Sequence, residues 1–123
     1  LRFRNQADRI LTLLAAHAAK APGAVSNAML AAELRSRGTT EVVISGDRPD
    51  LVRVAQVLWR PDVVLVWGER YDSPLWTGRD EEGTAGRGYV CRDNVCDAPA
   101  DTPETFYEKL TGRPVPEGAR LNV

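Results

Sequence analysis

Two cysteines separated by four residues, in the segment RGYVCRDNVCDAP, are the residues of this chain best suited to chemistry. If a two-residue turn is centred on Asp93-Asn94, both of which tolerate a positive φ, Cys91 and Cys96 face each other across a β-hairpin. They then form a non-hydrogen-bonded pair with Cα atoms about 4.5–5.5 Å apart, a separation that a disulfide accepts. The spacing predicts cross-strand neighbours, and it leaves open whether the sulfurs form a disulfide or redox pair or are reduced and buried.

Redox catalysis and metal binding fit the same two sulfurs less well. Thiol–disulfide catalysts usually present Cys-x-x-Cys at a helix N-terminus, where the helix dipole favours the thiolate, and a hairpin lacks this feature. A structural zinc ion needs four ligands, whereas the chain offers Cys91, Cys96 and the distant His17. We therefore expect no metal site, no cofactor and no set of catalytic residues in this chain.

A second candidate is the segment SGDRPD, between an apolar run and a helical pattern. Loops at the carboxyl end of a parallel strand often bind anions or nucleotides, which makes Ser45, Gly46 and Asp47 a candidate ligand loop. The segment lacks the glycine pattern of nucleotide-binding loops, and the carboxylates of Asp47 and Asp50 would repel phosphate. Capping of the next helix by Asp47 is the favoured interpretation.

Acidic and aromatic residues give weaker signals. The three consecutive acids at 80–82 could suggest the paired carboxylates of a glycosidase, but in a glycine-rich loop they are typical of a solvated tip. Large apolar surfaces occur near the predicted strand ends, at Trp59, Trp67, Tyr71 and Trp76. We expect these aromatic residues to lie in the core or at an interface rather than to stack on sugars.

The first part of the chain is predicted to be helical. Alanine-rich patterns at 5–21 and 26–37 predict a helical hairpin, with Ser26 or Asn27 as the N-cap of its second helix and Gly38 after its end. Such a hairpin has little apolar area, so it must pack against something larger. We treat residues 1–38 as one domain and residues 39–123 as a second, small α/β domain.

The second part alternates between strands and helices. The β-branched runs at 41–46 and 63–68 predict strands, and the segment 47–60 predicts a helix between them, which together make a parallel βαβ unit. A polar stretch leads to a third strand at 88–91, and the cysteine hairpin is followed by a last helix at 101–112. The predicted fold class is α/β: an N-terminal helical hairpin, a small three-stranded, mostly parallel sheet with a cysteine-bearing hairpin, and a C-terminal helix.

Composition and charge exclude some classes of partner. The 16 Lys and Arg residues are scattered singly against 17 Asp and Glu, which offers no electrostatic surface for nucleic acid. The longest apolar run, VVLVW, is far too short to cross a membrane, and no secretion signal is visible. We expect a cytoplasmic protein without nucleic-acid or membrane partners. Because the chain begins at Leu1 and has Met29 as its only methionine, we also expect it to be part of a longer protein.

The segment GRGYVCRDNVCDAPADTPETFYEKL resembles the C-terminal signature of large thioredoxin-domain-containing proteins of the spermatogenesis-associated protein 20 type. The upstream order EVVISGD, a helix and LWRPDVVLVW is similar to the same family, so the resemblance covers about residues 41–110. It implies an N-terminal thioredoxin-like domain, a six-hairpin (α/α) barrel similar to sugar epimerases and glycosidases, and this α/β end piece. Residues 5–38 would then be the closing helices of the barrel or helices beside it. The polar loop at 78–88 departs from the family pattern.

The resemblance and the residues together predict a non-catalytic structural and interaction module. Its partners would be the thioredoxin-like and barrel domains of the full-length chain, and the isolated piece would self-associate. Two alternatives follow from the same resemblance. Cys91 and Cys96 could exchange with the thioredoxin-like domain, or the chain could be an accessory part of a carbohydrate-active barrel.

Overall fold

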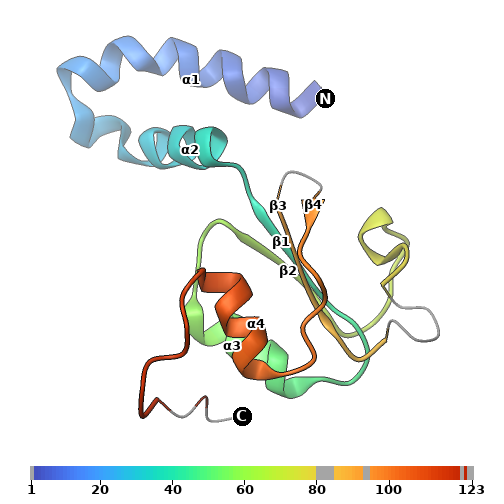
Figure 1. The fold of residues 1–123 in the computed structure, drawn as a ribbon. Coiled ribbons are helices and arrows are strands. Elements are labelled where there is room, and N and C mark those ends of the chain that lie inside the picture. The colour runs from blue at the N-terminus through green and yellow to red at the C-terminus, as the bar shows by residue number, and fades with distance from the viewer. Residues whose placement is uncertain (1, 80–84, 93–94, 120, 122–123) are drawn as a thin grey trace. The chain divides into compact units, whose positions relative to one another are not determined.

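The computed structural model describes residues 2–79, 85–92, 95–119 and 121, and the chain divides into two compact units, Leu1–Gly38 and Thr39–Val123. The described elements of the first unit are helical, and the second unit combines helices with a sheet (Figure 1). The fold class is α/β, as the sequence predicts. The expected turn at Asp93-Asn94 and the acidic residues 80–82 lie outside the described residues.

The first unit is a helical hairpin with little apolar burial. Helices α1 (Arg2–Lys20) and α2 (Ser26–Arg37) are joined by the short 3-10 helix η1 (Pro22–Val25), and an ion pair of 2.7 Å joins Arg35 to Asp8. None of the described residues from 3 to 38 is buried. The hairpin therefore has helical structure without a core of its own.

Of the two predictions for the ends of α2, the one for its C-terminus is confirmed and the one for its N-cap is wrong. Gly38 has a φ of 79°, and its N–H donates to the carbonyl oxygen of Leu34, which ends the helix as predicted. Val25 is the N-cap, and neither Ser26 nor Asn27 occupies that position. The reason is that η1 runs directly into α2, so both polar residues are already helical.

The second unit begins with the predicted βαβ arrangement. Strands β1 (Thr40–Ile44) and β2 (Val63–Val66) are parallel and are connected through helix α3 (Pro49–Leu58). Arg48 rather than Asp47 is the N-cap of α3, because Pro49 with its fixed φ is the first helical residue.

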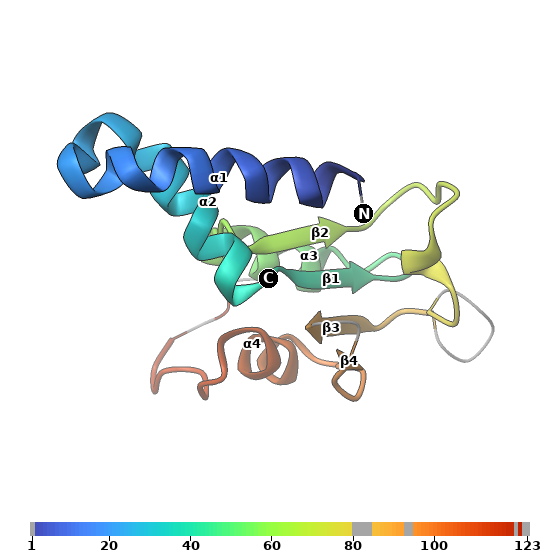
Figure 2. The same ribbon diagram turned by 90° about the horizontal axis from the view of Figure 1, so that it is seen from above.

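Strand β3 (Gly88–Arg92) is antiparallel to β1, and β4 (Val95–Cys96) is antiparallel to β3, so the sheet order is β2-β1-β3-β4 (Figure 2). The sheet thus has four strands of mixed direction, where the sequence predicts three mostly parallel strands. A parallel β3 would need a crossover, usually helical, of about a dozen residues. In the described part of the connection the one helical segment is the 3-10 helix η2 (Pro74–Trp76), and the Ser45 N–H donates to the Arg87 carbonyl at 3.0 Å. The chain therefore re-enters the sheet beside the end at which it left β1.

The core occupies both faces of this sheet. Helices α3 and α4 (Pro103–Thr111) cover one face (Figure 1). On that face Val42 and Val90 pack with Leu51 and Phe106. On the other face Trp76 of η2 packs with a second cluster of strand residues: Val43, Val66, Tyr89 and Cys91. Alternation along β1 and β3 explains the division, since neighbouring residues point to opposite faces. The second face is the one that carries the cysteine.

Candidate functional site

Strands β3 and β4 bring the two cysteines together in the predicted register. Cys91 lies opposite Cys96, and their sulfur atoms form a disulfide. The Cα atoms are 3.9 Å apart, closer than the about 4.5–5.5 Å of an ideal pair. Cys91 is completely buried, whereas Cys96 is exposed. The two ends of the bridge therefore differ in access to solvent.

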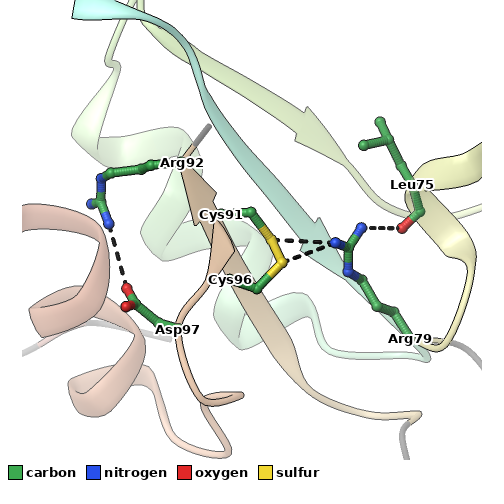
Figure 3. Close-up of a disulfide and its surroundings, with 6 residues drawn as sticks. All are labelled: Leu75, Arg79, Cys91, Arg92, Cys96 and Asp97. Atoms are coloured by element: carbon green, nitrogen blue, oxygen red, sulfur yellow. Dashed lines mark hydrogen bonds and ion pairs between the residues drawn. A yellow bond between two sulfur atoms is a disulfide. The ribbon is translucent and has the colours of Figure 1, made fainter. Parts of the chain in front are cut away.

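Arg79, from the turn that follows η2, lies against the disulfide (Figure 3). Its Nη2 donates to the Cys96 Sγ at 2.9 Å and reaches the Cys91 Sγ at 3.4 Å, while its Nη1 donates to the Leu75 carbonyl oxygen at 2.6 Å. Leu75 packs against the core cluster that contains Trp76 and Cys91. The bond to Leu75 therefore holds a positive charge next to both sulfurs.

Among the described residues, the other charged side chains around the bridge are paired or belong to the neighbouring strand. Arg92 donates to the Asp97 carboxylate at 3.4 Å (Figure 3). It also donates to the Lys109 carbonyl in α4 at 3.0 Å. Glu41 is the cross-strand partner of Cys91 on β1. Among the described side chains, Arg79 is the charged group that contacts the sulfurs directly.

Two of the three residues of the candidate ligand loop support the fold. Ser45 is completely buried, and its Oγ donates to the Arg87 carbonyl oxygen at 3.3 Å. Gly46 has a φ of 70°, and a Cβ at this position would lie 3.0 Å from the Gly86 nitrogen. Both residues hold the end of β1 against the chain that enters β3. Gly46 and Asp47 are both exposed, and of the two only Asp47 has a side chain to offer a ligand.

A pocket of about 570 Å³ nevertheless lies beside this loop, at the carboxyl ends of β1 and β2. Its walls include residues 46–49, Arg53 and Gln56 of α3, and Trp67-Gly68 after β2. Trp67 is 49% exposed, and the Arg53 and Gln56 side chains have no hydrogen-bond partner within the part of the chain that the structure describes. The pocket thus combines an aromatic surface with a free cation and a free amide.

Arg48 neutralises Asp50, one of the two acids that would repel an anion from this pocket. Its Nε and Nη2 donate to the two carboxylate oxygens of Asp50 at 2.8 Å and 2.6 Å. These hydrogen bonds hold the pKa of Asp50 below its usual range, against the opposing effect of partial burial. The same guanidinium donates to the carbonyl oxygens of Gly86 at 2.6 Å and Asp101 at 2.9 Å. Asp50 is therefore paired within the fold, and Asp47 is the remaining acid of the loop.

The sequence gives little or no signal for the residues that complete the disulfide site and the pocket. Arg79 lies in the polar stretch between β2 and β3, which has no hydrophobic period to indicate where a side chain points. Arg53 and Gln56 give a weak signal, because their spacing of three places them on one side of a helix next to a strand end.

Metal-ligand groups and membrane-spanning helices were not found among the described residues. No group of three or more His, Cys, Asp or Glu side chains there could hold a metal ion, and none of the described helices is long and apolar enough to cross a membrane. No protein-family model, curated protein or solved structure matches the chain. The resemblance carried by the cysteine segment therefore stays a hypothesis.

Proposed function

We propose that this chain is a structural and interaction module whose helical hairpin docks on an apolar surface of a larger protein. The supporting observation is that the hairpin has no buried residue among those described from 3 to 38, while Phe3, Leu13 and Leu30 are 82%, 73% and 60% exposed. Most of the stability of helices in proteins comes from tertiary packing, and an isolated helix as short as α2, with 12 residues, is marginal in water. A partner surface would supply the burial that the hairpin lacks.

The partner that agrees with the sequence resemblance is the helical barrel of a thioredoxin-domain-containing protein. In that arrangement α1 and α2 add to the closing helices of the barrel or pack beside them, and the thioredoxin-like domain belongs to the same assembly. The hairpin suits this role because its alanine-rich sequence lets neighbouring helices approach closely, and its larger apolar residues remain available for contact.

The α/β unit offers a second contact of the same kind. Val57 and Trp59 are 77% and 89% exposed at the end of α3, and Val95 is 74% exposed on β4. Trp59 has a φ of 37°, a left-handed conformation that is unusual for a bulky residue. Tryptophan is enriched among the residues that dominate protein interfaces, so Trp59 is the side chain we expect to anchor this contact.

Sedimentation velocity of the 123-residue chain tests the proposal. Without its partner, the apolar hairpin should associate with a second copy, so the sedimentation coefficient should rise with concentration. Replacing the exposed Leu13 and Leu30 by Glu should make the chain monomeric. The double variant Gln6→Glu/Ser36→Glu adds the same charge to exposed polar positions of the same helices and should associate as the unmodified chain does. A monomeric chain whose hairpin amides are strongly protected from exchange would contradict the proposal.

A small-ligand site is a second candidate function, favoured by the way in which Arg53, Gln56 and Trp67 surround the pocket beside Asp47. A planar or sugar ring could stack on Trp67 while Arg53 donates to a phosphate. Sugar phosphates and nucleotides should then raise the melting temperature of the chain. Arg53→Gln should remove this increase, whereas Arg113→Gln, at an exposed position far along the sequence, should not. If no compound raises the melting temperature, the loop has its structural role alone.

A further inference from the structure

We propose that the Cys91–Cys96 bridge is a thiol–disulfide exchange site in which an incoming thiolate attacks Cys96, and that Arg79 stabilises the thiolates formed. This goes beyond an interaction module, because it assigns an exchange reaction to a particular sulfur. The redox partner is defined by its chemistry, as a molecule or protein that carries a pair of thiols.

Access to solvent selects Cys96 as the attacked sulfur. Exchange requires the attacking sulfur, the attacked sulfur and the leaving sulfur to lie nearly in line. Cys91 is completely buried in the cluster with Trp76 and Tyr89, so a thiolate from solvent cannot approach it. Cys96 is exposed on the short edge strand β4. Burial therefore determines that Cys96 is the sulfur attacked and Cys91 is the sulfur that leaves.

Charge supports the exchange reaction itself, while burial selects the sulfur that is attacked. The Arg79 Nη2 is 2.9 Å from the Cys96 Sγ and 3.4 Å from the Cys91 Sγ, so it can stabilise a negative charge on either sulfur (Figure 3). An adjacent guanidinium is one of the features that favour a thiolate at reactive cysteines. Its position does not depend on the sulfurs alone, because Nη1 is bonded to the Leu75 carbonyl.

Within the part of the chain that the structure describes, the remaining charges near the bridge do not cancel Arg79. Asp97, next to Cys96 in sequence, is paired with Arg92, which also donates to the Lys109 carbonyl of α4. Glu41 on β1 is the cross-strand partner of buried Cys91, not of Cys96. A thiolate on Cys91, which burial and Glu41 both disfavour, therefore depends on Arg79 as the bridge opens.

The reaction balances without a cofactor. A thiolate of the partner attacks the Cys96 Sγ, the bond between Cys96 and Cys91 breaks, and the Cys91 Sγ leaves with the electron pair beside Arg79 before taking a proton from water. The second thiol of the partner then loses its proton to water and, as a thiolate, attacks the partner's sulfur in the mixed disulfide, which releases Cys96 as a thiolate. Two electrons pass from the partner dithiol, which becomes a disulfide, to the Cys91–Cys96 pair. The reverse sequence oxidises the pair.

Glutathione is the first probe. The oxidised 123-residue chain is incubated with glutathione, quenched with acid, and its mixed disulfide is located by tandem mass spectrometry. We expect the glutathione adduct on Cys96. An adduct mainly on Cys91, or no adduct while the disulfide persists, would overturn the assignment.

Single-cysteine chains test the role of Arg79. In the Cys91→Ser chain, the alkylation rate of Cys96 by iodoacetamide is measured against pH, with and without Arg79→Gln. Loss of the guanidinium should lower the rate at neutral pH about tenfold and move the midpoint of the pH–rate profile upward. Arg79→Lys keeps the charge and should restore most of the rate. In the Cys96→Ser chain, alkylation of Cys91 should be much slower.

Controls separate this role from a structural one. Circular dichroism identifies any variant that has lost its fold, and the glutathione experiment uses the unmodified chain, so it does not depend on the variants folding. The double variant Arg92→Gln/Asp97→Asn removes a nearby ion pair as a unit, so it leaves the net charge beside Cys96 unchanged and should leave the pH–rate profile unchanged. An unchanged profile in Arg79→Gln, or equal alkylation of Cys91 and Cys96 in folded chains, would reject the proposal.

Discussion

Gly88 determines how closely β3 approaches the helices above it. A Cβ at this position would lie 2.7 Å from Cδ2 of Phe106 and 3.3 Å from Cδ1 of Leu51, and both side chains are completely buried. Gly88→Ala must therefore displace the ring or the strand. We expect it to lower the free energy of unfolding, measured in urea, by about 1–3 kcal/mol.

The double variant Gly88→Ala/Phe106→Leu identifies the cause of that loss. Leucine removes the ring atoms that the new methyl group would meet, so the double variant should lose less stability than the sum of the two single variants. Strict additivity would mean that the ring of Phe106 is not what excludes a side chain at this position.

Trp59 has a backbone conformation that suits glycine better than tryptophan. Its φ is 37° and its side chain is 89% exposed, so removing the ring costs little packing. Trp59→Ala keeps the penalty of the left-handed conformation, whereas Trp59→Gly does not. Urea unfolding should therefore show the glycine variant to be more stable than the alanine variant by about 1 kcal/mol.

Val57 provides the matched comparison for Trp59. It is also exposed, at 77%, but it lies inside α3, where glycine is less favourable than alanine. The order should reverse there, with Val57→Ala more stable than Val57→Gly by up to about 1 kcal/mol. The same order at both positions would show that the conformation of Trp59 does not decide the effect.

The paired Arg48 and Asp50 make the end of β1, the start of α3 and the approach to α4 depend on pH. The side chains are 22% and 28% exposed, and the hydrogen bonds from Arg48 lower the pKa of Asp50 in the folded chain. A carboxyl whose folded pKa lies below its unfolded value, near 3.8, stabilises the fold fully above that pH and loses the contribution as the pH falls through the folded value.

The variant Asp50→Asn measures this contribution. It should be less stable than the unmodified chain by about 1 kcal/mol at neutral pH, and the difference should shrink as the pH falls below 4. Urea unfolding at a series of pH values checks it. Asp47→Asn changes the same loop without touching Arg48, and should show no such pH-dependent difference. A constant difference for Asp50→Asn across the series would mean that the ion pair is not its source.

Local signals explain what the sequence could predict at the level of elements. Helical periodicity located α1 and α2, glycine located the ends at Gly38 and Gly112, and the symmetry of the hairpin located the pairing of Cys91 with Cys96. The direction of β3 depends on whether the connection after β2 crosses the sheet, and polar residues carry no signal for that. The contact of Arg79 with the sulfurs was missed for the same reason, since it joins a loop to a hairpin through tertiary packing.

The two units of the chain differ in what holds them together. The unit Thr39–Val123 contains two clusters of buried side chains, whereas the unit Leu1–Gly38 has no buried residue among those described. Local opening free energy follows the amount of buried apolar contact. In the 123-residue chain under conditions that keep it monomeric, amides of α1 and α2 should exchange with protection factors below about 10², while those of β1 and β3 should exchange far more slowly.

A core variant shows whether the two units open together. Leu51→Ala removes a completely buried side chain from the α/β unit and should lower its stability by about 2–5 kcal/mol. Hydrogen exchange followed by mass spectrometry should then be faster in β1 and β3 and unchanged in α1 and α2, because none of the described hairpin residues belongs to that core. Protection of the hairpin as high as that of β1, lost together with it in Leu51→Ala, would mean that the chain unfolds as one unit. The hairpin would then need no external surface to be stable, which would remove the main support for a docking role.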